Sequence, residues 1–246
     1  MEQNLVPDEV VLLVREPALD ATKQSLGKDS QNVATIARLA GRATITLISY
    51  DSVGTEVRRV HITGPASKRR VKLEDFKRRA ITSIFNTRHG FVESTATYHF
   101  ENPSGRHTER FIRLSNILAR GAEIAFIGFC TLPYVPKHAT TAYLDTPSLY
   151  AVVAAINEQR SSFTGSVPLL ADNFSSYAGV GNFRFTRASD SIVLISASSS
   201  GSLASQLMAE HGFSATQITH LLFLGQDRSA SNIVCDLGHD ARENED

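Results

Sequence analysis

Alternation of short apolar runs with helical patterns is the feature that most constrains the fold of this chain. After Gly90, continuous apolar segments such as SIVLI (191–195) and ITHLLFL (218–224) alternate with segments whose apolar residues recur at helical spacing. Strands that are apolar on both faces are typical of parallel sheets covered by helices on both sides. We therefore predict a mainly parallel twisted α/β domain over 91–238, an α+β region over 1–90 that precedes it, and a polar tail over 239–246.

The individual elements follow from the same periodicities. Strands are expected at Val10–Val14, Ala43–Tyr50, Glu56–Thr63, Ser94–Phe100, Glu123–Cys130, Thr141–Leu144, Val167–Leu170, Ser191–Ile195 and Ile218–Leu224. Helices are expected at Gln31–Leu39, Lys72–Asn86, Thr108–Leu118, Ser148–Glu158 and Leu203–Glu210. Turn residues at Asp51–Gly54 predict a hairpin, and the polar stretch Thr22–Ser30 predicts a loop.

Composition places the protein among folded, soluble proteins. Of 246 residues, 42% are hydrophobic and 20% are charged, which excludes a largely disordered chain. Cys130 and Cys235 are too few for a disulfide framework, and no Cys/His cluster has the spacing of a zinc site. The first residues lack the pattern of a signal peptide, and no run is long enough to span a bilayer. We expect a cytoplasmic protein with no membrane contact.

Charge is divided unevenly along the chain. Residues 1–120 hold 19 Lys+Arg and 13 Asp+Glu, whereas residues 121–246 hold 6 and 12, so the halves carry +6 and −6. Seven of the twelve residues from Lys68 to Arg79 are basic. This basic cluster is either the solvated face of a helix or a docking surface for a nucleic acid or protein partner. Without interleaved aromatics it is not a stacking surface for bases.

The segment 191–210, SIVLISASSSGSLASQLMAE, carries the clearest sign of a binding site. An apolar strand ends in Ser196, Ala197, Ser198, Ser199, Ser200 and Gly201, and a helix begins through Ser202. This order puts backbone N–H groups, hydroxyls and the positive end of a helix dipole at the carboxyl edge of the sheet. The alternative is that a serine caps the helix and Gly201 turns the chain. A whole run of small residues favours a phosphate-binding loop, although the lysine and spacing of a Walker A motif are absent.

Two further segments are expected near this loop. Asp145, Thr146, Pro147 and Ser148 follow the strand TAYL and begin the next helix, so two helix N-termini are predicted to converge on one ligand, unless these residues are ordinary caps. Residues 100–114, FENPSGRHTERFIRL, form a turn followed by cationic donors. Its substrate-side candidates are Ser104, Gly105, Arg106 and His107.

These three segments, in this order, resemble the type I phosphoribosyltransferases, particularly the orotate phosphoribosyltransferase-like branch, over about residues 91–237. The resemblance implies a Ser-Gly-x-His turn at 104–107, a pyrophosphate loop at 145–148 and a 5′-phosphate loop in which Ser199, Ser200 and Gly201 match Thr-Thr-Gly. In that family two acidic residues before the loop hold the ribose hydroxyls. Here their positions carry Ile195 and Ser196, which provide no carboxylate for a ribose or for the Mg²⁺ that an active transferase would use.

The resemblance with this departure implies a degenerate phosphoribosyltransferase-like domain. We expect it to bind a 5′-phosphorylated nucleotide or sugar phosphate as a sensor or regulator, and to form a homo-oligomer. Divergent domains of this type resemble those of bacterial conflict and antiviral systems. One alternative is an active phosphoribosyltransferase or N-glycoside-cleaving enzyme whose acid is Asp145, Asp172 or Asp236. The other is an interaction module that uses the basic cluster.

The segment 172–189 has the location of an active-site lid. Gly179 and Gly181 are possible hinges, and Arg184 and Arg187 are possible phosphate partners. Tyr177 or Phe183 could stack on a base, although aromatics in such a segment more often pack against the sheet. The alternative is an ordinary surface hairpin.

Overall fold

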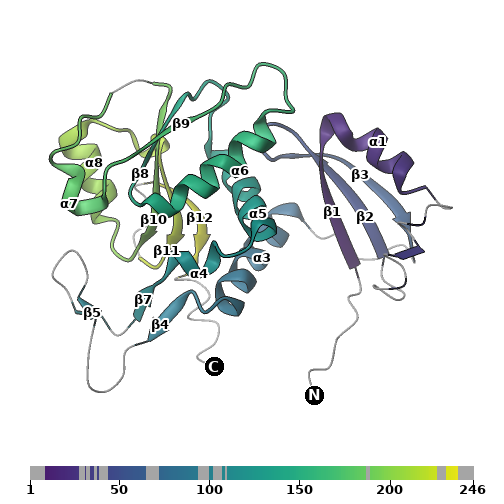
Figure 1. Cartoon of the computed structure of the whole chain (residues 1–246), viewed down its shortest axis with the longest axis horizontal. Coiled ribbons are helices and arrows are strands. Elements are labelled where there is room, and N and C mark those ends of the chain that lie inside the picture. The colour runs from purple at the N-terminus through teal and green to yellow at the C-terminus, as the bar shows by residue number, and fades with distance from the viewer. Residues whose placement is uncertain are drawn as a thin grey trace.

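The computed structural model describes residues 9–27, 44–64, 72–93, 100–101, 107–108, 110–186, 189–225 and 231–237, together with the helical residues 31, 34, 35 and 38. The predicted elements at Gln31–Leu39 and Ser94–Phe100 and the tail lie largely outside this part of the chain. Figure 1 shows a small N-terminal sheet beside a larger α/β body. The α/β fold class with a preceding α+β region is confirmed.

The N-terminal sheet has three strands, in the order β1-β2-β3. Strands β1 (Glu9–Arg15) and β2 (Thr44–Tyr50) are parallel, and β2 forms the predicted hairpin with β3 (Glu56–Thr63). A short 3-10 turn, η1 (Glu16–Ala18), leads into α1 (Leu19–Ser25). The predicted loop over Thr22–Ser30 is therefore wrong in its first part. Leu19 buries itself against Leu47 of β2, and that tertiary contact outweighs the polar local sequence.

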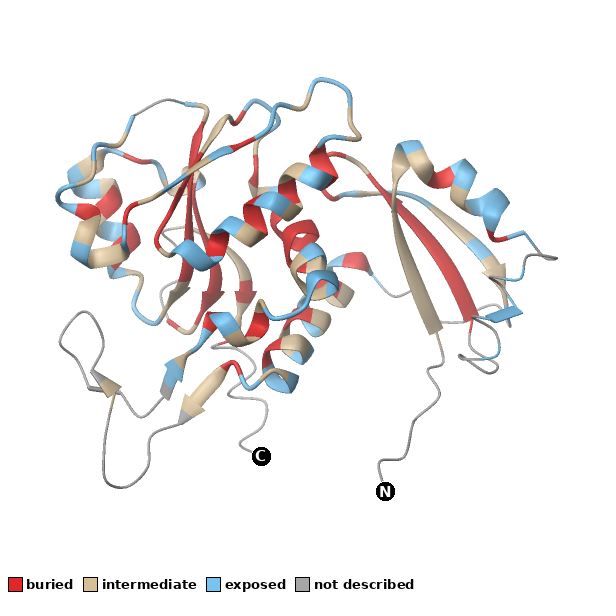
Figure 2. Cartoon of the chain, in the orientation of Figure 1, coloured by how far each residue is buried: buried red, intermediate tan, exposed pale blue. Residues whose placement is uncertain are grey.

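The α/β body is built on five parallel strands in the order β12-β11-β10-β8-β9. Their bounds are β8 (Thr141–Leu144), β9 (Leu170–Asn173), β10 (Ser191–Ser198), β11 (Ile218–Phe223) and β12 (Asn232–Asp236). Read from β9, the strands run 2-1-3-4-5 in chain order, which is a doubly wound arrangement. Strands β10 and β11 are almost wholly buried at the centre of the body (Figure 2).

Helices cover both faces of this sheet, as predicted. Alternate residues of β10 face opposite sides, so Leu194 joins one core cluster and Val193 and Ile195 join another. The first face is covered by α3 (Leu73–Thr87), α5 (Gly121–Thr131) and α6 (Tyr150–Arg160). The second is covered by α7 (Ser176–Val180) and α8 (Ser202–His211).

Smaller elements complete the described chain. They are β4 (Phe91–Glu93), β5 (Phe100–Glu101), β6 (His107–Thr108), β7 (Arg110–Ile112), α4 (Leu114–Ile117), and the 3-10 turns η2 (Leu132–Tyr134), η3 (Pro147–Leu149) and η4 (Ala215–Gln217). Strand β4 pairs with β7, and β5 pairs with β6, both antiparallel. No described helix combines the length and apolar character needed to cross a bilayer.

The N-terminal sheet packs directly on the body. Ile48 and Tyr50 of β2 belong to the same buried cluster as the helices of the first face. The Tyr50 hydroxyl donates to Gln159 Oε1 of α6 at 3.1 Å. Lys77 of α3 is 5% exposed, and its Nζ donates to the Gly54 carbonyl oxygen of the hairpin turn at 2.9 Å. Apolar and polar contacts therefore both join the two sheets.

Three predicted elements differ from the structure. Residues Glu123–Cys130 form part of helix α5 and not a strand, because a run that is apolar on every side suits a buried helix equally well. The predicted helix Thr108–Leu118 contains β7, which pairs with β4, and becomes helical only at Leu114. The strand predicted at Val167–Leu170 begins at Leu170 and continues to Asn173.

Candidate functional site

The chain connections single out one place at the carboxyl edge of the sheet. Strands β8 and β10 are neighbours, but the chain leaves β8 toward β9 on one side and leaves β10 toward β11 on the other. In doubly wound sheets, ligands bind outside the carboxyl ends of the strands at such a switch point. The predicted phosphate-binding loop and the second loop follow these two strands, so they meet at this point.

A hydrogen-bonded pair joins the ends of the two strands. The Asp145 carboxylate, 3% exposed, accepts the Ser196 backbone N–H at 2.9 Å and the Ser196 hydroxyl at 2.7 Å. Burial raises the pKa of the Asp145 carboxyl to about 6, and the hydrogen bonds from Ser196 oppose a larger rise. Both Ser196 donors are thus used within the protein, and Asp145 positions the strand ends.

The serine loop itself is shorter than the sequence indicates. Strand β10 continues through Ala197 and Ser198, which pair with Leu222 and Phe223, so the turn comprises residues 199–201. The prediction that the loop begins at Ser196 is corrected by this longer ladder. Gly201 has φ +74°, a left-handed conformation that favours glycine, and its N–H donates to Ser198 Oγ at 2.9 Å.

The N-terminus of α8 lies open to further hydrogen bonds. No side chain caps this ten-residue helix, and the Ser202 N–H reaches Ser200 Oγ only at 3.4 Å. A chain of hydroxyls lies beside it: Tyr177 of α7 contacts Ser202 Oγ at 2.5 Å, and Ser202 contacts Ser200 Oγ at 2.8 Å. Uncapped N–H groups, rotatable hydroxyls and the helix dipole together favour an anion. In the structure, Tyr177 therefore contacts the loop through its hydroxyl group.

Thr146 of the second loop and Asn173 of β9 each have a buried polar atom that lacks a partner among the described residues. Thr146 has an extended backbone two residues after the end of β8, and neither η3 nor α6, which follow it, has a side-chain cap. Its Oγ1 atom and the Nδ2 atom of Asn173 have no hydrogen-bond partner there. Asn173, the last residue of β9, pairs with Leu144, the last residue of β8, so Asn173 and the second loop both lie at the carboxyl edge of the sheet. Sequence reasoning missed Asn173, which lies beyond the predicted strand Val167–Leu170, and the half-exposed strand β9 has no apolar pattern that would have marked its end.

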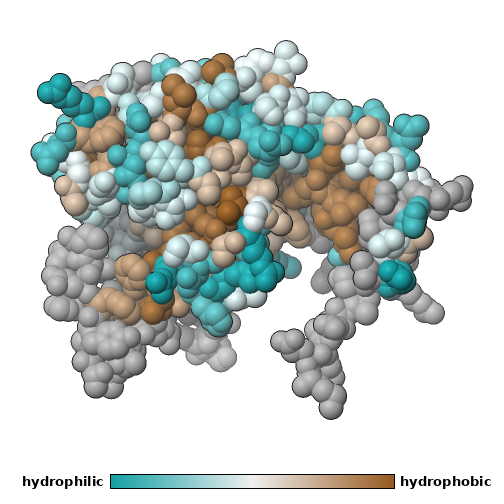
Figure 3. Space-filling model, viewed as in Figure 1, coloured by the Kyte–Doolittle hydropathy of each residue, from teal (hydrophilic) through white to brown (hydrophobic). Residues whose placement is uncertain are grey.

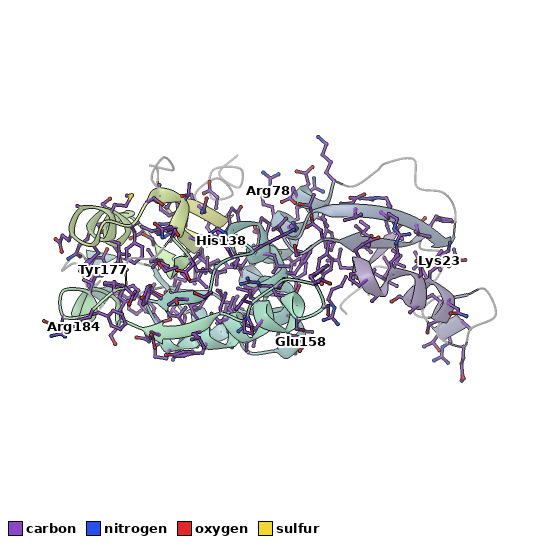
Figure 4. All side chains as sticks on the ribbon, turned by 90° about the horizontal axis from the view of Figure 1, so that it is seen from above. Lys23, Arg78, His138, Glu158, Tyr177 and Arg184 are labelled. Atoms are coloured by element: carbon purple, nitrogen blue, oxygen red, sulfur yellow. The ribbon has the colours of Figure 1, made fainter. Side chains whose placement is uncertain are left out.

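The predicted lid segment packs against the body. Phe183 and Phe185 contact the Tyr143 ring edge-on, with centroids 5.7 and 5.1 Å away. The Tyr143 hydroxyl donates to the Thr186 carbonyl oxygen and accepts the Thr186 N–H. These aromatics therefore pack on the sheet, which was the alternative to base stacking. Arg184 is exposed at the end of the molecule opposite Lys23, as Figure 4 shows, and Arg187 lies outside the described residues.

The remaining predicted groups do not join this site in the described chain. Residues 104–106 lie outside it, and His107 is described only as part of β6. In the basic cluster, Lys77 is buried over the Phe129 ring and pairs with Glu74, while Arg78 pairs with Asp75. Figure 4 places Arg78 far from Tyr177.

The three candidate acids are dispersed. Asp145 directly follows β8, Asp172 lies exposed on β9 and Asp236 ends β12. Strands β9 and β12 are opposite edges of the sheet, four strand spacings apart, which is about 19 Å. No group of three His, Cys, Asp or Glu residues in the described ranges could hold a metal ion. With Ile195 buried and Asp145 occupied by Ser196, the described residues do not fit a Mg²⁺-dependent ribose site.

Comparison with known proteins finds distant structural similarity. No protein-family model and no curated protein matches the chain. The chain is similar to orotate phosphoribosyltransferase from Aeropyrum pernix, with 12% identity, TM-score 0.40, and 66% of this chain and 97% of that chain covered. It is similar to UMP synthase from Leishmania donovani, with 14% identity, TM-score 0.44, and coverages of 67% and 38%.

A third solved structure is orotate phosphoribosyltransferase from Mycobacterium tuberculosis H37Rv in complex with inorganic phosphate. Identity is 14%, the TM-score is 0.39, and 66% of this chain and 96% of that chain are covered. Two of these three structures are named orotate phosphoribosyltransferases. The strand order β12-β11-β10-β8-β9 of the body establishes its doubly wound α/β fold.

Proposed function

We propose that this protein binds a 5′-phosphorylated nucleotide or sugar phosphate between β10 and α8, and acts as a sensor or regulator without ordinary phosphoribosyl transfer. The observation that carries the proposal is the uncapped N-terminus of α8 at the switch point of the sheet, beside the hydroxyls of Ser200 and Ser202. Binding replaces the internal hydroxyl chain with bonds to phosphate oxygens.

The absence of a free carboxylate at the strand end supports binding without transfer. Transfer develops positive charge on the ribose, which a nearby carboxylate stabilises by several kcal/mol. Ile195 is 1% exposed in the core, and Ser196 donates both its N–H and its hydroxyl to Asp145. Neither residue offers negative charge to a ribose.

Thermal denaturation with candidate ligands tests this function. Inorganic phosphate, ribose 5-phosphate, nucleoside monophosphates and phosphoribosyl pyrophosphate are compared with the unphosphorylated nucleosides. At 100-fold excess over Kd, a bound ligand stabilises by about 2.7 kcal/mol, which raises Tm by about 5–10 °C for a chain of this size. Absence of any shift at millimolar concentration contradicts the proposal. Release of pyrophosphate or free base during incubation with these ligands would show that the protein is an enzyme and not a sensor.

A pair of matched glycine variants locates the site. Gly201→Asp adds a carboxylate at the α8 N-terminus, where it repels phosphate and takes its hydrogen bonds. Gly165→Asp is the control, because Gly165 has a similar φ of +81° and a Cβ added there would have nothing within 4 Å. We expect the phosphate-dependent shift to disappear in the first variant and to persist in the second. Equal shifts in both would place the ligand elsewhere.

A further inference from the structure

Strand β1 forms one edge of the N-terminal sheet and lacks the features that usually prevent an edge strand from pairing with another chain. It pairs with β2 without interruption from Glu9 to Arg15, and no described strand pairs with its other side. All seven residues are only partly buried, and the five from Val10 to Val14 are aliphatic. Edge strands in soluble proteins usually carry lysine, proline or a bulge that prevents pairing with another chain. Strand β1 has none of these.

The opposite edge of the same sheet shows the contrast. Strand β3 has two irregularities in its register with β2 and carries Arg58, Arg59 and His61. Arg58 pairs with Glu16, and Arg59 pairs with Glu56. This edge therefore has the charges and bulges that discourage pairing. At the position of β1 in Figure 1, Figure 3 shows a hydrophobic surface.

We propose that β1 is the interface of a homodimer in which it pairs antiparallel with β1 of a second copy. The sequence EVVLLVR is self-complementary about Leu12. In that register Glu9 lies opposite Arg15 of the partner subunit, and Val10 lies opposite Val14 of the partner subunit. Paired residues share a face, so the two opposite-charge pairs flank an aliphatic centre.

Charge selects this arrangement over a parallel one. In-register parallel pairing of two β1 strands would bring the two copies of Glu9 together at one end and the two copies of Arg15 together at the other. The antiparallel pairing also has two-fold symmetry, which closes the assembly at two chains. It joins the two N-terminal sheets into one sheet of six strands.

The charged residues already have partners within the chain and retain capacity for more. Glu9 Oε1 accepts the Thr46 hydroxyl at 2.8 Å, and Arg15 Nη1 donates to the Glu158 carbonyl oxygen at 3.1 Å. A carboxylate has two acceptor oxygens, and a guanidinium has five N–H donors. Pairing of one seven-residue strand is a small interface, so we expect reversible dimers with a Kd in the micromolar range.

Sedimentation velocity of the full chain from about 1 to 100 µM measures the dimer. Val10→Lys places a charge at the interface without removing a member of a core cluster, and we expect a monomer throughout this range. Val57→Lys is the control, since Val57 is 48% exposed on β3 at the opposite edge of the sheet, and we expect wild-type association. A wild-type monomer at the highest concentration, or a dimer unaffected by Val10→Lys, overturns the proposal.

Charge reversal tests the register. Glu9→Arg or Arg15→Glu alone creates two like-charge pairs in each dimer and should raise Kd about tenfold. The double variant Glu9→Arg/Arg15→Glu restores both opposite-charge pairs and should return Kd to near the wild-type value. Circular dichroism of each variant checks that it is folded. Failure of the folded double variant to recover association refutes the register.

Discussion

Replacing Asp145 with asparagine should change how stability depends on pH. The folded pKa of about 6 lies above the ordinary value of 3.8, so between these values the folded protein binds more protons than the unfolded chain. The contribution of Asp145 to stability is therefore most favourable below pH 3.8, falls as the pH rises to about 6, and is constant above. Asp145→Asn keeps the size of the side chain and an oxygen for the Ser196 N–H, and it removes the titration.

The magnitude follows from the two pKa values. A difference of about two units corresponds to about 3 kcal/mol of unfolding free energy. We expect the stability of Asp145→Asn, relative to wild type, to increase by up to about 3 kcal/mol between pH 4 and pH 7. Asp145→Asn also removes one acceptor for the Ser196 hydroxyl, which lowers the unfolding free energy of the variant by about 1 kcal/mol at every pH. This constant loss does not change how the difference between variant and wild type depends on pH.

Urea denaturation of both proteins at several pH values from 4 to 8 measures this slope. The difference between variant and wild type is the relevant quantity, because titrations common to both proteins cancel in it. Asp172→Asn controls for the loss of an exposed carboxylate on the neighbouring strand. A difference between Asp145→Asn and wild type that stays the same from pH 4 to pH 7 would refute the argument.

Two other substitutions test the packing of the body. Gly128→Ala should destabilise the protein by about 1–3 kcal/mol, because its new Cβ would lie 2.8 Å from Ala155 Cβ. Gly121→Ala is the control, since its new Cβ would have nothing within 4 Å, and we expect no loss of stability. Thermal denaturation compares the two variants. His220 is fully buried, which lowers its pKa to about 4, so its contribution to stability is lost as the pH falls from 6.5 to 4, opposite in sign to the contribution of Asp145. His220→Leu should lose that dependence in urea titrations, and an unchanged pH profile would contradict this assignment.

The parallel sheet could be predicted from sequence because its strands are apolar on both faces. Helix α5 could not, because its apolar run has no polar side that would reveal a helical period. Helix α5 lacks a polar side because it packs closely against α6, so closely that a Cβ at Gly128 would collide with α6. Such close packing depends on residues distant in sequence.

The position of the serine turn between a strand and a helix could be predicted from the sequence, but its hydrogen bonds could not. A strand, a small-residue turn and a helix predict where the loop lies, since these are local signals. That Ser196 would donate to Asp145 depends on two strands 51 residues apart becoming neighbours. Likewise, Lys77 belongs to a basic run in sequence, and only the fold brings Gly54 and Phe129 to its ammonium group.

Helix α3 has a consequence for any attempt to dissect the protein. Leu73, Ile81 and Phe85 belong to the main core of the body, although they precede the five-stranded sheet by more than fifty residues. A shortened chain that starts at Phe91 would expose the surfaces these side chains cover and would lose the edge-on contact between Phe85 and Phe91. Ile48 and Tyr50 of β2 belong to the same cluster, so the smallest fragment that keeps this core intact must begin upstream of Ile48.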